Sequence, residues 1–255
     1  MPLLGLLAWR EDRRYGPRSA RWLAIPAGLF FAADLVFWHY AIGDVGAGLS
    51  TVLGNLQVVV VPFLAWLILG ERIQPRLLAA LPLVCSGVVL ISGVLETGAY
   101  GDDPMRGVLF GVLTGLTYAG FILVLRQAGS DLRRPAGPLF DTTLVATVVA
   151  AIAGLAIGEV DLVPAWPAHG WLVVLALTSQ VLGWLLIAIS LPRLPAALTS
   201  VTLTIQPVCS VLLGVILLGE DPSALQLAGV ACILAGLVSV ALRRDPTRRP
   251  VPEPA

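Results

Sequence analysis

Long apolar runs, separated by short charged or Gly- and Pro-rich segments, make up almost the whole chain. The pattern predicts eight membrane-spanning helices, over residues 22–42, 46–69, 75–95, 107–126, 137–158, 168–190, 195–218 and 223–242. The breaks between them combine charge with Gly or Pro, and GDVGAG (43–48) predicts a flexible polar loop. The Pro-rich tail, residues 243–255, is predicted to be disordered. The expected fold is an all-α integral membrane protein.

Composition supports a lipid environment. Hydrophobic residues make up 57% of the chain and charged residues 13%, with a mean hydropathy of +0.89, whereas a soluble domain carries about a quarter charged residues. The three cysteines lie inside apolar runs without the spacing of a metal site or a disulfide framework. No cofactor and no metal is therefore expected.

The arginines predict the orientation in the membrane. With the N-terminus in the cytoplasm, fifteen of them fall on the cytoplasmic side and only Arg106 falls outside. This positive-inside bias requires an even number of spans and places both termini in the cytoplasm. We therefore expect a multi-pass protein of the cell (inner) membrane.

The sequence contains an internal repeat at an offset of 149 residues. Residues 34–91 align with residues 183–240 without a gap, with thirteen identical positions. Gln57 aligns with Gln206, and Gly70-Glu71 aligns with Gly219-Glu220. The predicted topology puts the two Gly-Glu pairs on opposite faces, so the copies are inverted. Inverted repeats that hold a substrate near the membrane midplane are a common plan of secondary transporters.

Particular residues of the two copies resemble the EamA-type proteins of the drug/metabolite transporter superfamily. In that family's repeat, a span begins with small residues, has a Pro midway and ends in Gly-Glu. Ala197-Leu198-Thr199, Pro207 and Gly219-Glu220 match in the second copy. Ala47, Leu49, Ser50 and Gly70-Glu71 match in the first copy, where Val58 replaces the Pro and Pro62 follows one turn later.

The resemblance implies five spans per repeat and ten in all. Here the first repeat (1–95) has three predicted spans and the second (107–242) has five. The opening MPLLGLLAWREDRR resembles the inner end of a second span and its basic loop. We therefore expect that two N-terminal helices are absent, through a misplaced start or truncation. A genuine eight-span protein is the alternative.

Asp34 is the leading candidate for a functional residue. It lies near the middle of its span, where a carboxylate costs about 2.5–3.5 kcal/mol, so it should face the bundle interior. There it could carry protons or balance a cationic substrate, or it could be a structural hydrogen-bonded group. Phe37 and Trp38 lie one turn further on the same face, where an aromatic wall would suit an amine or an amino acid.

Further candidates lie on other spans. Two polar stripes could line a translocation path or make interhelical hydrogen bonds, one of Ser50, Gly54 and Gln57 and one of Thr199, Thr202, Gln206 and Ser210. Pro207 removes a backbone donor and predicts a helix break that exposes a carbonyl, or else a simple kink. Asn55, Tyr118, Gln180 and Trp184 are second-rank candidates for substrate binding. Packing is the favoured interpretation of Gly107, Gly111 and Gly115. Solvated loop charge is the favoured interpretation of Glu71 and Glu220, with a gating or helix-end role as the alternative.

The leading functional hypothesis is a secondary transporter of a small organic metabolite, such as an amino acid, an amine or a drug-like compound. Export by alternating access is favoured. The expected partners are this substrate, the lipid bilayer and, through Asp34, protons; a homodimer is left open, and no nucleic acid is expected. A membrane-embedded enzyme is the runner-up, without a reactive motif such as HExxH or GxSxG. A nonfunctional truncated remnant is the third hypothesis.

Overall fold

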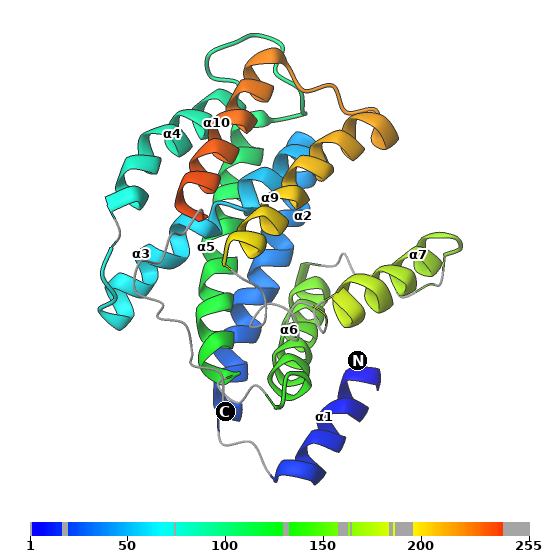
Figure 1. The fold of residues 1–255 in the computed structure, drawn as a ribbon. Helices are drawn as coiled ribbons and strands as arrows, with labels where there is room; N and C mark the ends of the chain where they lie inside the picture. The colour runs from blue at the N-terminus through cyan, green and yellow to red at the C-terminus, as the bar shows by residue number, and fades with distance from the viewer. Residues whose placement is uncertain are drawn as a thin grey trace.

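The computed structural model describes residues 2–16, 20–73, 75–129, 133–157, 163, 165–183, 186 and 196–241. Within these ranges the regular structure is entirely helical (Figure 1). The elements are α1 (Pro2–Tyr15), η1 (Arg21–Leu23), α2 (Ala24–Gly54), α3 (Gln57–Leu69), α4 (Pro75–Ile91), α5 (Pro104–Ala128), α6 (Ala136–Ile157), α7 (Ala168–Leu175), η2 (Ala176–Gly183), α9 (Ala196–Leu213), η4 (Gly214–Leu218) and α10 (Ala224–Ala241). The predicted all-α fold is confirmed.

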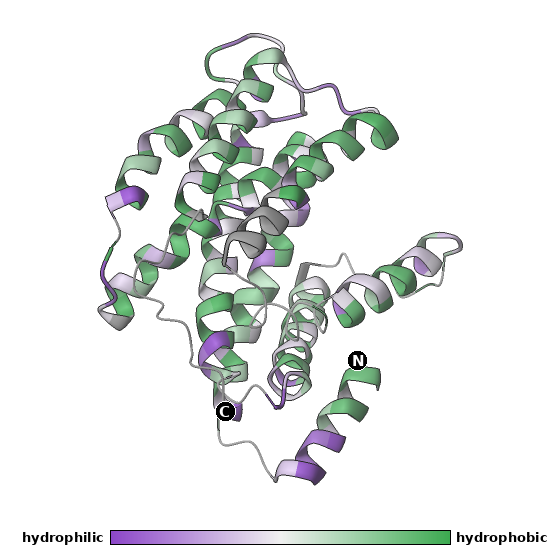
Figure 2. Cartoon of the chain, viewed as in Figure 1, coloured by the Kyte–Doolittle hydropathy of each residue, from purple (hydrophilic) through white to green (hydrophobic). Residues whose placement is uncertain are grey.

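The helices present apolar surface outward, as a protein embedded in lipid does. Among the described residues, three helical stretches are long and apolar enough to cross a membrane, namely Arg21–Gly54, Pro104–Ala128 and Ala136–Ala156, and five shorter apolar helices coincide with the other predicted spans. Figure 2 shows hydrophobic residues along the helices and hydrophilic residues concentrated toward helix ends and loops. Large side chains such as Leu67, Trp171 and Ile216 are about 70% exposed.

The flexible loop predicted at residues 43–48 is wrong, because the chain there stays helical except at Gly46, where it reverses direction. Gly46, with φ of +83° and ψ of 168°, interrupts the helical backbone of α2. On α5, Gly107 lies against Val45 and Gly120 against Phe30, so residues 24–45 run antiparallel to α5. Gly111 lies against Leu53 and Gly115 against Leu56, so the chain after Gly46 runs parallel to α5. Two predicted spans therefore meet at one residue.

Glycines on α5 allow this close helix packing. Cβ atoms added at Gly111 and Gly115 would lie 2.6 and 3.2 Å from side chains of α2 and of the turn after it. Small residues at such contacts let helix backbones approach each other, which drives association in lipid. The interpretation of Gly107, Gly111 and Gly115 as helix-packing residues is confirmed.

The internal repeat recurs in the contacts between α4 and α10, which correspond under the 149-residue offset. A Cβ on Gly87 of α4 would lie 2.7 Å from Cγ1 of Ile233 and 2.6 Å from the Gly229 carbonyl oxygen. A Cβ on Gly236, the counterpart of Gly87, would lie 2.5 Å from Cγ2 of Val84, the counterpart of Ile233. Such reciprocal contacts are the signature of two-fold symmetry. Figure 1 shows the two helices running in opposite directions.

Both copies of the Gly-Glu motif end a helix in the same way. Gly70 and Gly219 have φ of +67° and +70°, a left-handed conformation that suits glycine. The following amides donate to carbonyls six residues back, from Glu71 to Ala65 and from Glu220 to Gly214. The motif therefore codes for a helix terminus, at opposite ends of the bundle in Figure 1.

The N-terminal helix α1 packs against α6. Leu4 and Ala8 are its buried residues, and Gly5 lies against Phe140 of α6. The backbone amides of Ala136 and Gly137 donate to the Glu11 carboxylate at 3.1 and 2.8 Å. A carboxylate at a helix N-terminus is a stabilising arrangement, so α1 is tied to the start of α6.

We expect Gly87→Ala to destabilise the bundle, because its Cβ would press on the Gly229 carbonyl oxygen and force α4 and α10 apart. Overpacking of this kind costs roughly 1–3 kcal/mol. The melting temperature in detergent measures the effect. Gly43→Ala is the matched control, because a Cβ there meets no atom within 4 Å. Equal melting temperatures for the two variants would contradict the proposed tightness of this contact.

Candidate functional site

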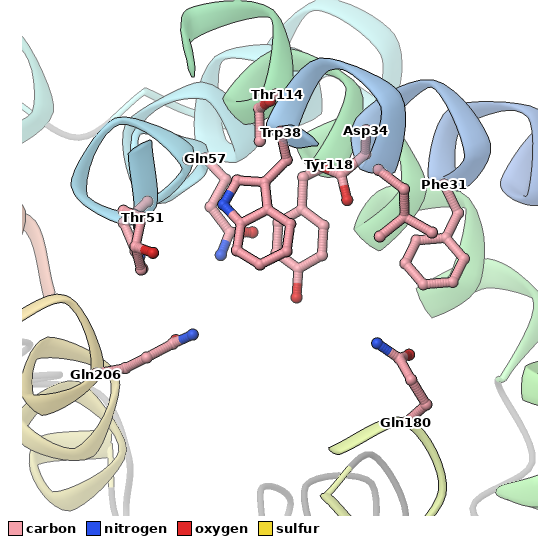
Figure 3. Close-up of a pocket in the computed structure, with 12 residues that line it drawn as sticks. Phe31, Asp34, Trp38, Thr51, Gln57, Thr114, Tyr118, Gln180 and Gln206 are labelled. Carbon is pink, nitrogen blue, oxygen red and sulfur yellow. Dashed lines mark hydrogen bonds between the residues drawn. The ribbon is translucent and has the colours of Figure 1, made fainter. Parts of the chain in front are cut away.

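A cavity of about 190 Å³ lies between the helices of the two repeats. It is lined from α2, α3, α5, α9, the turn after α2 and the π-helical segment η2 by Phe31, Asp34, Leu35, Trp38, Thr51, Gly54, Asn55, Gln57, Thr114, Tyr118, Gln180 and Gln206. Figure 3 shows the amides of Gln180 and Gln206 projecting into the space that faces Asp34, Trp38 and Tyr118. A concave site with a few convergent polar groups is the usual form of a small-molecule site.

The structure brings together six of the eight residues predicted to bind substrate. Asp34, Trp38, Gln57, Tyr118, Gln180 and Gln206 all line the cavity, although they come from five separate elements. Trp184 lies outside the described residues, as does the side chain of Thr202 on α9. Their common location is an observation, whereas their role in binding stays a prediction.

Among the described residues that line the cavity, Asp34 supplies the one acidic side chain. Asp34 is only 7% exposed, and in the part of the chain that the structure describes no hydrogen bond or ion pair to it is found. A buried carboxylate in a membrane span is energetically costly unless a proton or a cation accompanies it. The cavity can therefore receive a cationic group at Asp34.

Aromatic rings form the wall on either side of Asp34. Phe31 stacks on Phe121 with ring centroids 4.7 Å apart, and Tyr118 lies 5.6 Å from the same ring. Trp38 lies one turn beyond Asp34 and is partly exposed to the cavity. Phe37, expected beside Trp38, instead stacks on Phe110 at 6.1 Å and is not part of the lining.

Thr51 and Asn55 join the wall through hydrogen bonds to the α2 backbone. The Thr51 hydroxyl donates to the Ala47 carbonyl at 2.7 Å, and the Asn55 amide donates to the Thr51 carbonyl at 2.8 Å. These bonds fix both side chains in place. Ser50, which the sequence put in the polar stripe, is fully buried and donates to the Ala47 carbonyl, so it lies outside the cavity lining.

The predicted helix break at Pro207 is not observed. Helix α9 continues through Pro207, which is buried, as far as Leu213. The change in helical pattern comes later, at the π-helical residues Gly214–Leu218. A second π-helical segment, Ala176–Gly183, carries Gln180 into the cavity. Such segments are frequent at functional sites, so irregular backbone is present at other positions than the one predicted.

Sequence reasoning missed four lining residues, Phe31, Leu35, Thr51 and Thr114. Phe31 precedes Asp34 by three positions and was detectable from the same helical spacing that pointed to Trp38. The offset of 149 residues also pairs Phe31 with Gln180 and Gln57 with Gln206, and all four line the cavity. Thr114 gave no signal, because it stands in an apolar run among glycines.

Comparisons with known proteins place the chain among membrane carriers. The model of the EamA-like transporter family matches residues 1–93 and 105–242. A protein of Pseudomonas aeruginosa, named Uncharacterized protein PA1977, is 32% identical over 250 residues, which is 94% of this chain and 82% of that protein. A shorter match of 83 residues, 37% identical, joins 32% of this chain to 30% of the zinc transporter ZupT of Escherichia coli. The chain thus covers less than a third of ZupT.

We expect cysteines placed on the cavity wall to react with a water-soluble maleimide. In a chain whose Cys85, Cys209 and Cys232 are replaced by alanine, Gln57→Cys and Gln206→Cys should be labelled rapidly, as followed by intact mass. Ser50→Cys is the control, because Ser50 is fully buried beside the cavity. If Ser50→Cys reacts as fast as the other two, the cavity is not the aqueous space described.

Proposed function

Because the chain belongs to the EamA-like transporter family, we propose that it is a secondary carrier of small organic amines or amino acids. The proposal rests on one observation above all: Asp34 lies buried in a cavity between the two repeats, among aromatic rings and side-chain amides. A carboxylate beside aromatic faces attracts an ammonium group through both charge and cation–π contact. The amides of Gln57, Gln180 and Gln206 supply donors and acceptors for the rest of the substrate.

The symmetry of the cavity supports alternating access as the mechanism. Gln57 and Gln206 occupy equivalent positions in the two repeats and both line the cavity. A site to which both inverted repeats contribute can stay in place while one repeat moves against the other. We assign residues 1–95 and 107–242 to these repeats, and export as the direction of transport. An enzymatic role is not favoured, because the cavity groups bind and orient but include no reactive constellation of the kind that chemistry requires.

The cavity volume favours a small substrate. Pockets for drug-sized ligands measure roughly 300–1,000 Å³, and this cavity measures about 190 Å³. A single ammonium group with a short apolar or amphipathic body would match both the volume and the lining. Coupling to protons through Asp34 is part of the proposal, with the proton and the substrate competing for the same carboxylate.

We expect reconstituted protein to take up small amines or cationic amino acids saturably, as measured with radiolabelled compounds in proteoliposomes. Uptake is measured and not current, because exchange of one monovalent cation for one proton moves no net charge. The panel should include neutral and anionic metabolites, and Zn²⁺ because of the short ZupT match. Empty liposomes are the blank. Saturable uptake of the cationic compounds supports the proposal, and saturable uptake of anions or of Zn²⁺ alone would replace its substrate class. The absence of any saturable uptake would refute a carrier function for this chain.

We expect Asp34→Asn to weaken the apparent affinity for a cationic substrate by about tenfold or more, since it removes a charge worth over 1.4 kcal/mol in a buried site. It should also remove the pH dependence of transport. Asp141→Asn is the matched control, because Asp141 is similarly buried but pairs with Arg21 at 3.3 Å away from the cavity lining. An Asp34→Asn protein with wild-type affinity and pH profile would refute both proposed roles of Asp34, in binding a cationic substrate and in coupling transport to protons.

A further inference from the structure

Glu220 is buried at the end of the bundle where the chain reverses, contrary to the solvated role predicted for it. The side chain follows η4 in the second repeat, and the residue is only 5% exposed. Its carboxylate accepts hydrogen bonds from the backbone amides of Ala47 and Gly48, the latter at 3.0 Å. These amides begin the helix that follows Gly46 in the first repeat. Glu220 thus joins the two repeats by capping a helix N-terminus, where a negative charge is stabilised.

Three glycines make room for this carboxylate. Cβ atoms added at Gly46 and Gly48 would lie 2.7 and 2.9 Å from carboxylate atoms of Glu220, and one at Gly214 would collide with Oε2. Gly48 also lets the two repeats approach, since its Cβ would lie 3.0 Å from the Val211 Cα atom. The position of the Glu220 carboxylate therefore depends on the absence of side chains at Gly46, Gly48 and Gly214.

The opposite end of the bundle lacks this arrangement. Glu71, the repeat counterpart of Glu220, is half exposed and pairs with Arg126 at 3.6 Å. The counterparts of Gly46, Gly48 and Gly214 are Pro195, Ala197 and Ala65. Ala197 and Ala65 each carry a Cβ atom, and a Cβ atom at the corresponding glycine, Gly48 or Gly214, would clash with the Glu220 carboxylate. Proline at position 195 also cannot take the positive φ of Gly46, so residue type alone argues against the same arrangement at Glu71.

We propose that Glu220 is a one-sided latch, which holds its own end of the carrier closed in the absence of substrate, and that the Glu71 end has no equivalent. The proposal rests on the carrier function proposed above, because a latch matters only if that end opens during transport. Opening would separate Glu220 from the amides of Ala47 and Gly48 and expose the carboxylate to water. The empty carrier therefore favours the state that is closed at the Glu220 end.

The test measures access to the cavity and needs no transported substrate. A membrane-impermeant maleimide is added from the Glu220 face of oriented vesicles, and the labelling rate of Gln206→Cys in the cysteine-free chain is followed. Glu220→Ala should raise this rate roughly fivefold or more, the effect of losing one N-terminal cap. Glu220→Gln, which keeps the shape and one acceptor, should raise it less. Asp221→Asn, an exposed neighbour, should leave it unchanged.

A graft tests the role of the glycines. Ala65→Gly, Pro195→Gly and Ala197→Gly together should allow Glu71 to cap α9, and should slow labelling from the Glu71 face. Adding Glu71→Gln should cancel that change, although Glu71→Gln alone should have little effect. A graft without effect would overturn the glycine explanation of the asymmetry.

The outcomes separate the latch from the carrier function. If wild-type protein transports but well-folded Glu220→Gln and Glu220→Ala proteins show unchanged labelling, the latch is wrong and the carrier function stands. If the labelling rates shift as expected while no compound of the panel is taken up saturably, the latch stands and the proposed function falls. A melting temperature for each variant, measured in detergent, establishes that the protein is folded.

Discussion

Close backbone contact at glycines is the constraint on which this bundle depends. In lipid, moving an apolar side chain from contact with lipid tails to a helix interface gains little free energy. Helices therefore associate through tight packing and hydrogen bonds. Gly107, Gly111 and Gly115 let α5 lie against both arms of the chain on either side of Gly46, and Gly87 with Gly236 joins the repeats. The cavity is lined in part by α2 and α5, the helices that the α5 glycines bring together.

The site combines a symmetric frame with an asymmetric charge. Gln57 and Gln206 are equivalent under the repeat, but the position equivalent to Asp34 is Gly183. One repeat thus supplies the carboxylate and the other supplies amide groups such as Gln180. In the proposed carrier, the repeat symmetry favours a substrate position shared by both halves, and the Asp34 charge would orient a cationic substrate within it. Substrate recognition and the transport movement would then depend on different features of the same helices.

The sequence predicted much of the fold because hydrophobicity alone determines which segments enter a membrane. The spans, the repeat offset and the glycine packing follow from residue type and spacing. Six of the eight binding candidates reached one cavity because a polar residue in an apolar span has few places to face other than the interior. These predictions used only residue type and spacing along the chain, which are sufficient where a segment's own composition determines its placement.

Other features depended on contacts between distant residues, which spacing does not reveal. The helix that begins after Gly46 is capped by Glu220, which lies over 170 positions away. Pro207 looked like a break, but α9 tolerates it and changes its pattern at Gly214, beside the same carboxylate. Glu71 and Glu220 both follow Leu-Gly, but the first is half exposed and the second is buried, and the difference lies in the residues that approach them.

The reciprocal contact between α4 and α10 has a consequence for how such a chain evolves. Each helix carries a surface that fits its own counterpart turned around, with Gly87 against Ile233 and Gly236 against Val84. A surface complementary to itself needs no second gene to find its partner, so a single ancestral repeat could have assembled in opposing orientations through this helix. Once both copies lie on one chain, a larger residue at position 236 can be offset by a smaller one at position 84, whereas at Gly87 the Gly229 carbonyl oxygen, a backbone atom, also lies in the way. Positions 84 and 236 should therefore change together across descendants of the duplication, and position 87 should stay glycine.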